Sequence, residues 1–394
     1  MNILYSGLED LSKPCAQRTH VSEIVNNFAK LGNDVHLIAL KKGDLKLHSN
    51  VKFYKIFPII NKRFLSLATL NIQKIHIKSL IKKIIKKEKV DVIYERDNAF
   101  DYGIKIGKKL GIKTVLELNG VSSQEAKSQG LSKEQVRMIN SNELDRIKYA
   151  DKIIAVTDGI KEYYSSLGVA KSKFKVISNG VNTSLFKPMD KNSCRKNLGF
   201  GDFPIIGFIG SFRPYQGLEY AIKMMPYVLK AIPQARLVLV GDAGKYNNFQ
   251  FHPTIDELKN LAKNEGVLDN IFFTGRIEHD LIPFYINASD VCISPLTLRR
   301  NVGGGSPLKI YEYLSCGKPV ICSSVKNVKE IIQKFNCGIC VEPDNLRELA
   351  EKIVFLIKNQ KMLDMFGNNG RKAVLTDFSW ESIAAKLLIE FREM

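Results

Sequence analysis

Short apolar runs alternate along this chain with longer segments in which apolar residues recur every three or four positions. At the N-terminus, residues 2–7 predict a strand, about His20 to Leu31 a helix, and Val35–Leu40 a second strand. A strand, a crossover helix and another strand are typical of a parallel sheet. The alternation therefore predicts an α/β protein built on parallel sheets.

The alternation occurs in two successive series, separated by the polar and interrupted stretch 187–202, which we interpret as a linker. At 394 residues the chain exceeds what one hydrophobic core usually supports, so two domains are expected. The first series adds strands at 51–60, 90–94, 113–118 and 152–156 and helices at 72–87, 99–110 and 132–149. The second has strands at 205–209, 236–240, 271–273, 290–295 and 319–322 and a helix at 218–230.

A glycine-rich loop in the second series leads directly into a predicted helix. The run 303–305 is all glycine, Ser306 suits the N-cap and Pro307 suits the first helical position. Backbone N–H groups at such a helix start bind anions, and Lys309 adds a positive charge in the first turn. We therefore predict a phosphate site here. The alternative is a flexible loop before an ordinary helix.

Parallel-sheet domains bind ligands beyond the carboxyl ends of their strands. In the second series the loops after residues 209, 240, 273 and 296 are expected to converge there, and all four contain glycine. The first strand of the chain lacks a following GxGxxG, so a dinucleotide site at that strand is not supported.

The net charge of +19 is unevenly distributed. Residues 41–90 contain 14 Lys or Arg against two acids, which leaves +12, and the helix at 72–87 places lysines opposite an isoleucine stripe. One interpretation is a solvated helix packed through its isoleucines. A second hypothesis is an anionic membrane surface contacting 62–90. Nucleic acid is not expected, because no aromatic residues interleave the lysines.

The N-terminus lacks the pattern of a signal peptide, and no apolar stretch approaches 18 residues. The seven cysteines are therefore expected to be reduced, and Cys337–Cys340 is interpreted as part of a strand rather than a metal site. These features predict a cytoplasmic protein, with peripheral attachment to the cytoplasmic face of the membrane as the added hypothesis.

The order and spacing of several motifs resemble those of the retaining glycosyltransferases of family 4, over nearly the whole chain. The motifs are 207–213 with Gly217, 239–242, 273–275, 288–290, 306–321, 179–182 and 378–381. The resemblance implies the GT-B fold, in which two Rossmann-like parallel-sheet domains face each other across a cleft. It implies an acceptor-binding domain at 1–186, completed by the C-terminal helix 379–394, and a donor-binding domain at 203–378.

The resemblance also implies a nucleotide-sugar donor, UDP- or GDP-linked, with no other cofactor and no metal. Glu312 would bind the ribose hydroxyls, and Arg213 and Lys309 would meet the diphosphate. Asn119 lies where many relatives carry a histidine near the reacting sugar, and His20 and Arg96 are expected on the acceptor side. The implied donor-binding residues are Gly210, Ser211, Gln216, Gly241, Gly275, Arg276, Ile277, Gly305, Ser306, Pro307, Leu308 and Glu312.

Two positions depart from the family pattern. The acid that usually precedes Glu312 by eight residues is Gly304 here, and the lysine that usually precedes Gly217 is Gln216. We hypothesise that Lys309 replaces the missing lysine. The expected reaction is sugar transfer with retention to an acceptor, including a lipid-linked or cell-envelope glycan. The alternatives are a nucleotide-sugar epimerase and a non-catalytic protein that binds a nucleotide sugar or a lipid.

Overall fold

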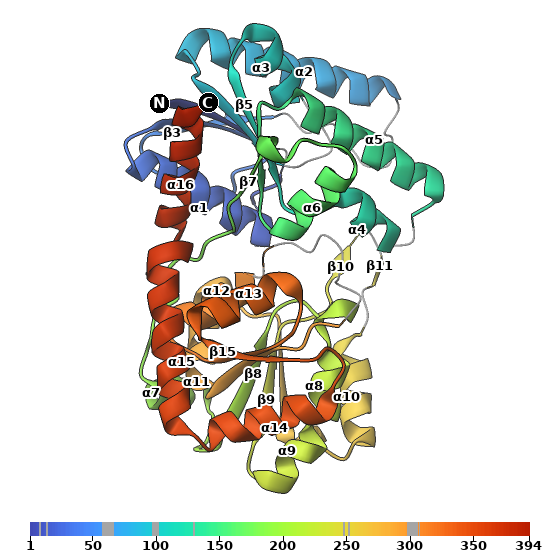
Figure 1. Cartoon of the computed structure of the whole chain (residues 1–394), viewed down its shortest axis with the longest axis vertical. Helices are drawn as coiled ribbons and strands as arrows, with labels where there is room; N and C mark the ends of the chain where they lie inside the picture. Colours follow the sequence, from blue (N-terminus) through green and yellow to red (C-terminus); the bar gives the residue numbers. More distant parts are fainter. Residues whose placement is uncertain are drawn as a thin grey trace. The chain divides into compact units, whose positions relative to one another are not determined.

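The computed structural model describes residues 1–7, 9–12, 15–56, 67–96, 102–128, 131–246, 249–250, 253–297, 306 and 308–394. The chain forms two compact units (Figure 1). The first comprises Met1–Gly180, Val302–Ser306 and Trp380–Met394, and the second comprises Val181–Asn301 and Pro307–Ser379. The chain thus passes from the first unit to the second after Gly180, whereas the sequence analysis ended the first domain at residue 186.

The first unit is built on a seven-stranded sheet. Its strand order is β3-β2-β1-β4-β5-β6-β7, and every described neighbouring pair is parallel. The parallel sheet that the sequence predicts is therefore confirmed. The strands are β1 (Asn2–Ser6), β2 (Asp34–Ala39), β3 (Val51–Lys55), β4 (Val92–Arg96), β5 (Lys113–Leu118), β6 (Lys152–Ala155) and β7 (Phe174–Val176).

Helices cover both faces of this sheet because successive strand residues point to opposite sides. On one face the ring of Tyr94 packs 6.0 Å from that of Phe28 and 5.4 Å from that of Phe391. On the other, Ile93 packs with Ile77 and Ile81. The helices are α1 (Ala16–Lys30), α2 (Leu67–Glu88), α3 (Tyr102–Leu110), α4 (Ser122–Ser128), α5 (Lys133–Tyr149), α6 (Asp158–Ser166) and α16 (Trp380–Glu393).

The second unit is built on a six-stranded sheet. Its order is β12-β9-β8-β13-β14-β15, again with parallel pairs. A separate short hairpin joins β10 (Lys245–Tyr246) and β11 (Phe249–Gln250). The six strands are β8 (Ile205–Ile209), β9 (Arg236–Val240), β12 (Ile271–Gly275), β13 (Val291–Ser294), β14 (Val320–Ser323) and β15 (Gly338–Val341). Strand β15 contains most of the Cys337–Cys340 segment that the sequence analysis assigned to a strand.

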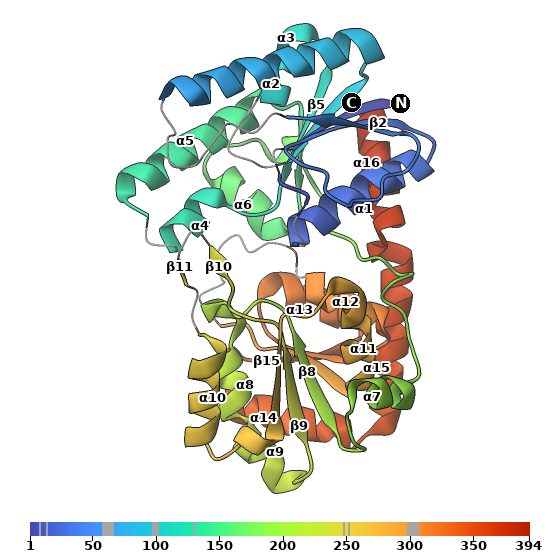
Figure 2. The ribbon, with the colours of Figure 1, turned by 180° about the vertical axis from the view of Figure 1, so that it is seen from behind.

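Two apolar cores flank this sheet. Ile206 and Phe208 of β8 belong to one, and Ile205 and Ile209 belong to the other. Figure 2 shows α8 and α10 on one side of β8 and β9, and α11 on the other. The helices that contribute residues to the first core are α8 (Leu218–Lys223), α9 (Met225–Ala231), α10 (Ile255–Asn264), α14 (Leu346–Ile357) and α15 (Gln360–Ala373). Those that contribute to the second are α11 (Ile282–Ala288), α12 (Leu308–Ser315) and α13 (Lys326–Phe335).

Three helix predictions differ from the structure. The helix predicted at 72–87 is longer and spans Leu67–Glu88. The first helix begins at Ala16 rather than near His20, because the Cys15 side chain accepts a hydrogen bond from the Arg18 amide and caps it. The single helix predicted at 218–230 is divided into α8 and α9. Pro226 follows the division and lacks the N–H group that a continuous helix would use.

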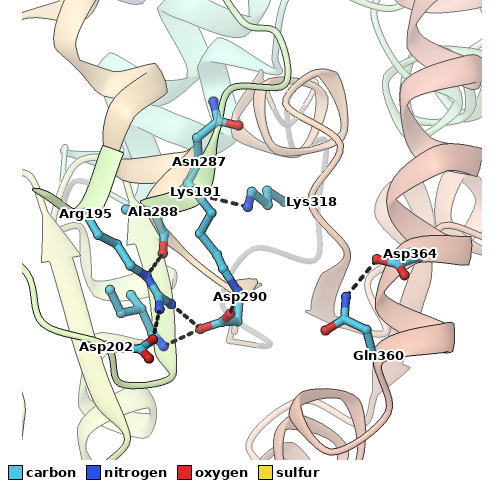
Figure 3. Close-up of polar contacts among 10 residues, drawn as sticks. Lys191, Arg195, Asp202, Asn287, Ala288, Asp290, Lys318, Gln360 and Asp364 are labelled. Atoms are coloured by element: carbon cyan, nitrogen blue, oxygen red, sulfur yellow. Dashed lines mark hydrogen bonds and ion pairs between the residues drawn. The ribbon is translucent and has the colours of Figure 1, made fainter. Parts of the chain in front are cut away.

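The stretch predicted as a linker contains helix α7 (Lys191–Leu198). Its Arg195 donates to the carbonyl of Ala288 at 3.0 Å and to the carboxylate of Asp290 at 2.6 Å (Figure 3). Lys191 also donates to Asp290, at 2.9 Å. These charge-assisted contacts fix α7 beside α11 and β13, so most of the stretch is a packed part of the second unit.

No helix in the described part of the chain has the length and apolar character needed to cross a membrane.

Candidate functional site

The strand order of the second unit reverses between β8 and β13. The chain builds outward from β8 to β9 and β12, and then from β13 to β14 and β15. Loops that leave such adjacent strands in opposite directions open a crevice, which is the usual ligand site of this architecture. The loop after β8 begins at Gly210, and the loop after β13 begins at Pro295.

These two loops pack closely at Gly217. Its φ of +71° lies in the left-handed region, and a Cβ there would lie 1.7 Å from the carbonyl oxygen of Pro295. Only glycine fits both the conformation and the space. The segment before Gly217 is therefore held against β13, and this positions Gln216, which is 5% exposed.

Lys309 extends from the first turn of α12 to the loop after β8. Its Nζ donates to Gln216 Oε1 at 2.7 Å and lies 4.0 Å from the centroid of the Phe208 ring. A Cβ at Gly210 would lie 2.8 Å from the same Nζ. The structure thus brings together Lys309, Gln216 and Gly210, three residues that the sequence analysis assigned to the donor site. The phosphate role of Lys309 stays a prediction.

Two more predicted glycines lie beside Gly210. The amide of Gly210 donates to the Val240 carbonyl at 3.0 Å, and that of Gly241 donates to the Gly275 carbonyl at 2.9 Å. A Cβ at Gly241 would lie 2.0 Å from the Gly210 carbonyl oxygen. The ends of β8, β9 and β12 are therefore in direct contact, which confirms that these loops converge.

Glu312, in the second turn of α12, is a carboxylate without a hydrogen-bond donor among the described residues. Its side chain is 19% exposed, and one of its oxygens lies 4.0 Å from Nε2 of His279, a ring that is a cation only when protonated. Burial raises the pKa of Glu312 to about 7, although Lys309 opposes the shift. Burial also lowers the pKa of His279. The Glu312 carboxylate is thus suited to accept hydrogen bonds from a ligand, in keeping with its predicted role toward a ribose diol.

The remaining donor-side predictions fall on surface loops. Arg213 is half-buried, with its amide bonded to the Ser211 carbonyl at 3.0 Å, and Ser211 is exposed. Arg276 is exposed, and Ile277 packs against the core that contains α12.

In the expected phosphate loop, Ser306 is buried and Leu308 starts α12 half-buried. The run 303–305, including Gly304 and Gly305, and Pro307 lie outside the described residues.

In the first unit the strand order reverses between β1 and β4, and polar side chains collect at this edge of the sheet. Arg96 ends β4 and is in register with Glu117 of β5. Both are buried, at 8% and 2% exposed. Arg96 donates to Glu9 at 3.0 Å, and its Nε lies 3.7 Å from Glu117. Although burial opposes its charge, Tyr5 and the two carboxylates raise the pKa of Arg96.

Glu117 is the centre of this cluster. Its carboxylate accepts hydrogen bonds from Tyr94 Oη and from Asn119 Nδ2, and it lies 2.9 Å from His20 Nε2. Although burial would raise it, His20, Arg96 and Tyr94 hold the pKa of Glu117 at about 2. The carboxylate is therefore ionised over the whole physiological range.

The three first-unit residues predicted for the site, His20, Arg96 and Asn119, thus all contact one residue that the sequence analysis did not name. His20 lies in the second turn of α1 and is 3% exposed, with its ring 5.1 Å from Trp380. Its acceptor-side role and that of Arg96 stay predictions. The signal that could have identified Glu117 is an acid flanked by apolar residues near the end of a predicted strand, where burial requires partners.

Several polar atoms of this cluster lack a partner among the described residues. They are the hydroxyl of Tyr5, Nδ1 of His20 and Oε2 of Glu9. In the described chain, no group of three His, Cys, Asp or Glu side chains is arranged to hold a metal ion. The expectation of metal independence stays a prediction.

Two family profiles match the chain. The profile described as "Glycosyltransferase Family 4" matches residues 17–185, and the one described as "Glycosyl transferases group 1" matches residues 190–373. Together they span both compact units.

Among curated proteins, an uncharacterised glycosyltransferase of Methanocaldococcus jannaschii is 26% identical over 93% of this chain and 91% of its own length. The GDP-mannose-dependent monoacylated alpha-(1-6)-phosphatidylinositol monomannoside mannosyltransferase of Corynebacterium glutamicum is 29% identical over 65% of this chain and 64% of its own. Among solved structures, an Anabaena protein crystallised with UDP has a TM-score of 0.76 and 18% identity, with both chains covered completely. The same Anabaena protein has also been crystallised with UDP-glucose. At this level of identity, the comparison with the Anabaena structures shows that the two proteins share a fold.

Proposed function

Since this chain is a glycosyltransferase of family 4, we propose that it transfers a sugar from a nucleoside diphosphate sugar to an acceptor hydroxyl, with retention at the anomeric carbon and without a metal ion. The observation that carries the proposal is the contact of Lys309 with Gln216 and Gly210 at the β8/β13 reversal. It places an ammonium group and glycine backbone where such folds bind ligands. The UDP, UDP-glucose and GDP-mannose of the relatives support a UDP- or GDP-linked donor.

The donor site has two functional parts. Lys309 and Arg213 would stabilise the negative charge that grows on the diphosphate as the bond to the sugar breaks. The Glu312 carboxylate, which receives no hydrogen bond from the described residues, would accept a hydrogen bond from each of the two ribose hydroxyls. Binding of those donors would favour the ionised form of Glu312, since hydrogen bonds to a carboxylate lower its pKa.

In the proposed reaction the acceptor oxygen forms a bond to the anomeric carbon on the face that the leaving group occupies. The bond between that carbon and the phosphate oxygen breaks, and the bonding electron pair leaves with the nucleoside diphosphate. The acceptor's proton passes to the departing phosphate oxygen. The protein then supplies position and charge stabilisation rather than a covalent nucleophile.

For the acceptor, we propose a glycan or lipid-linked sugar presented at an anionic membrane surface. In helix α2, Ile77, Ile81 and Ile84 are buried, and the lysines between them are exposed. Each lysine near an anionic bilayer contributes about 1 kcal/mol to attachment. Within the predicted surface 62–90, residues 62–66 lie outside the described chain. The lipid substrate of the Corynebacterium relative supports this choice.

A thermal-shift panel of UDP- and GDP-linked sugars tests the donor part of the proposal. A ligand at about 100 times its dissociation constant adds about 2.7 kcal/mol of stability, which raises Tm measurably. The ligand that gives the largest shift is then incubated with candidate acceptors, and the products are followed by mass spectrometry. Free nucleotide together with an acceptor heavier by one sugar supports the proposal. Binding without turnover over a broad set of acceptors, or conversion of the donor to an isomer, would overturn it.

A further inference from the structure

The Glu117 cluster fixes the orientation of Asn119. Three donors bind one carboxylate, namely His20 Nε2, Tyr94 Oη and Asn119 Nδ2, and the charged Arg96 lies beside it with Nε 3.7 Å away. An ionised carboxylate only accepts hydrogen bonds. The Asn119 atom that faces it must therefore be the NH2 group.

The direction of the Asn119 carbonyl group follows from this orientation. With Nδ2 bound to Glu117, the carbonyl oxygen Oδ1 points away from the carboxylate. Among the described residues no group donates to Oδ1, and the side chain is half-buried rather than exposed. Asn119 thus presents its carbonyl oxygen, which only accepts hydrogen bonds, just after the end of β5.

We infer that Glu117 is a positioning residue, which holds Asn119 so that its carbonyl oxygen receives a hydrogen bond from a sugar hydroxyl during transfer. The inference rests on the proposed function for the presence of a sugar, and on the cluster itself for the orientation. A free asparagine would present its amide and its carbonyl in turn, and a hydroxyl would then meet the wrong atom part of the time. Fixing the rotamer in advance removes that cost.

A double-mutant cycle separates positioning from simple support of the fold. Nucleotide release from UDP-glucose and from GDP-mannose is measured for the wild type, for E117Q and N119A, and for the double variant. If Glu117 acts through Asn119, each single change lowers kcat about tenfold or more, because a hydrogen bond involving a charged group is lost or misdirected. The double variant should then equal N119A within about twofold. Multiplying effects would overturn the inference, since they show that Glu117 acts independently of Asn119.

A matched control comes from the same unit. Glu390 is also a buried carboxylate, with its side chain 4% exposed, and it pairs with Lys152 at 2.8 Å and Lys175 at 2.7 Å. E390Q should lower Tm without changing kcat. If E390Q lowers kcat as much as E117Q does, the effect of Glu117 is structural and the inference fails.

A readout without turnover tests the orientation of Asn119 separately from the proposed function. With asparagine labelled with nitrogen-15, the Asn119 side-chain NH2 is assigned by its loss in N119A. Its protons should exchange slowly in the wild type and faster, at a shifted position, in E117Q. An Asn119 signal that is unchanged in E117Q overturns the inference, whether or not the enzyme is active. A lack of activity on both nucleotide sugars would count against the proposed function and not against the orientation of Asn119.

Should E117Q fail to fold, N119D serves in its place. The carboxylate that N119D introduces would keep an outward oxygen but could not donate to Glu117, so the rate of this variant should fall as in N119A. A wild-type rate in N119D would overturn the inference.

Discussion

Replacing Lys309 with methionine tests the proposed donor site. Methionine keeps an unbranched stem against Phe208 and Gly210, so the change removes mainly the ammonium group. A charge-assisted hydrogen bond to phosphate is worth about 1.5–3 kcal/mol, and about 1.36 kcal/mol corresponds to a factor of ten. K309M should therefore bind UDP or GDP about 10 to 150 times more weakly, as measured by isothermal titration calorimetry. Its Tm without ligand checks the fold.

The geometry also predicts a rescue. Lys309 Nζ lies 2.7 Å from Gln216 Oε1, so an ammonium group carried by residue 216 can reach nearly the same place. The double variant K309M/Q216K should regain most of the lost affinity, which is the arrangement that the family pattern would have. K223M removes an exposed lysine of α8 and should leave binding unchanged. Wild-type nucleotide affinity in K309M would refute the assignment of Lys309 to the phosphates, and so would equal losses in K309M and K223M.

The other predictions concern Glu312, Gly217 and helix α2. Because the pKa of Glu312 is raised to about 7 and its ionised form accepts hydrogen bonds from the ribose hydroxyls, affinity for an intact nucleotide sugar should rise with pH up to about 7 and then level off. E312Q should bind the same ligand weakly at every pH. A pH profile in E312Q that parallels the wild-type profile would refute this. G217A should lower Tm more than G266A, since both φ angles are near +70° but only Gly217 lacks room for a Cβ; equal shifts on thermal melting would contradict the packing argument. Changing the lysines at 82, 83, 86 and 87 to glutamine should weaken sedimentation with phosphatidylglycerol vesicles but not with phosphatidylcholine vesicles, and an unchanged bound fraction would leave only the solvated-helix interpretation.

Short apolar runs were enough to place most strands of the two parallel sheets, because a strand buried on both faces needs a continuous apolar run. Strand β7 and the short hairpin of β10 and β11 were not predicted. Ile205–Ile209 and Arg236–Val240 have the predicted bounds in the structure. The same signal could not reveal α7, whose sequence is mostly polar. That helix is held by Arg195 bonding to Ala288 and Asp290, more than 90 residues away in the chain. No local pattern encodes a partner at that distance.

The candidate site shows the same limit. Lys309 was identified because it adds a positive charge to the first turn of a helix that follows a glycine-rich loop. Its contact with Gln216 joins positions 93 residues apart, and the sequence suggested it only through a family comparison. Glu117 lies 97 residues from His20, and no local sequence pattern predicts the three donors that bind its carboxylate. The sequence identified which kinds of residue belong to the site, but only the folded structure shows which residues contact one another.

The two units use the same kind of side chain in opposite ways. Glu117 is surrounded by donors, so its pKa is about 2 and its hydrogen-bonding capacity is taken up by the protein. Glu312 is also largely buried but has no donor among the described residues, and its pKa is about 7. A buried carboxylate without donors destabilises its own ionised form, and this cost is recovered only when a ligand supplies the hydrogen bonds. Glu117 is therefore suited to fix other side chains, whereas Glu312 is suited to bind substrate.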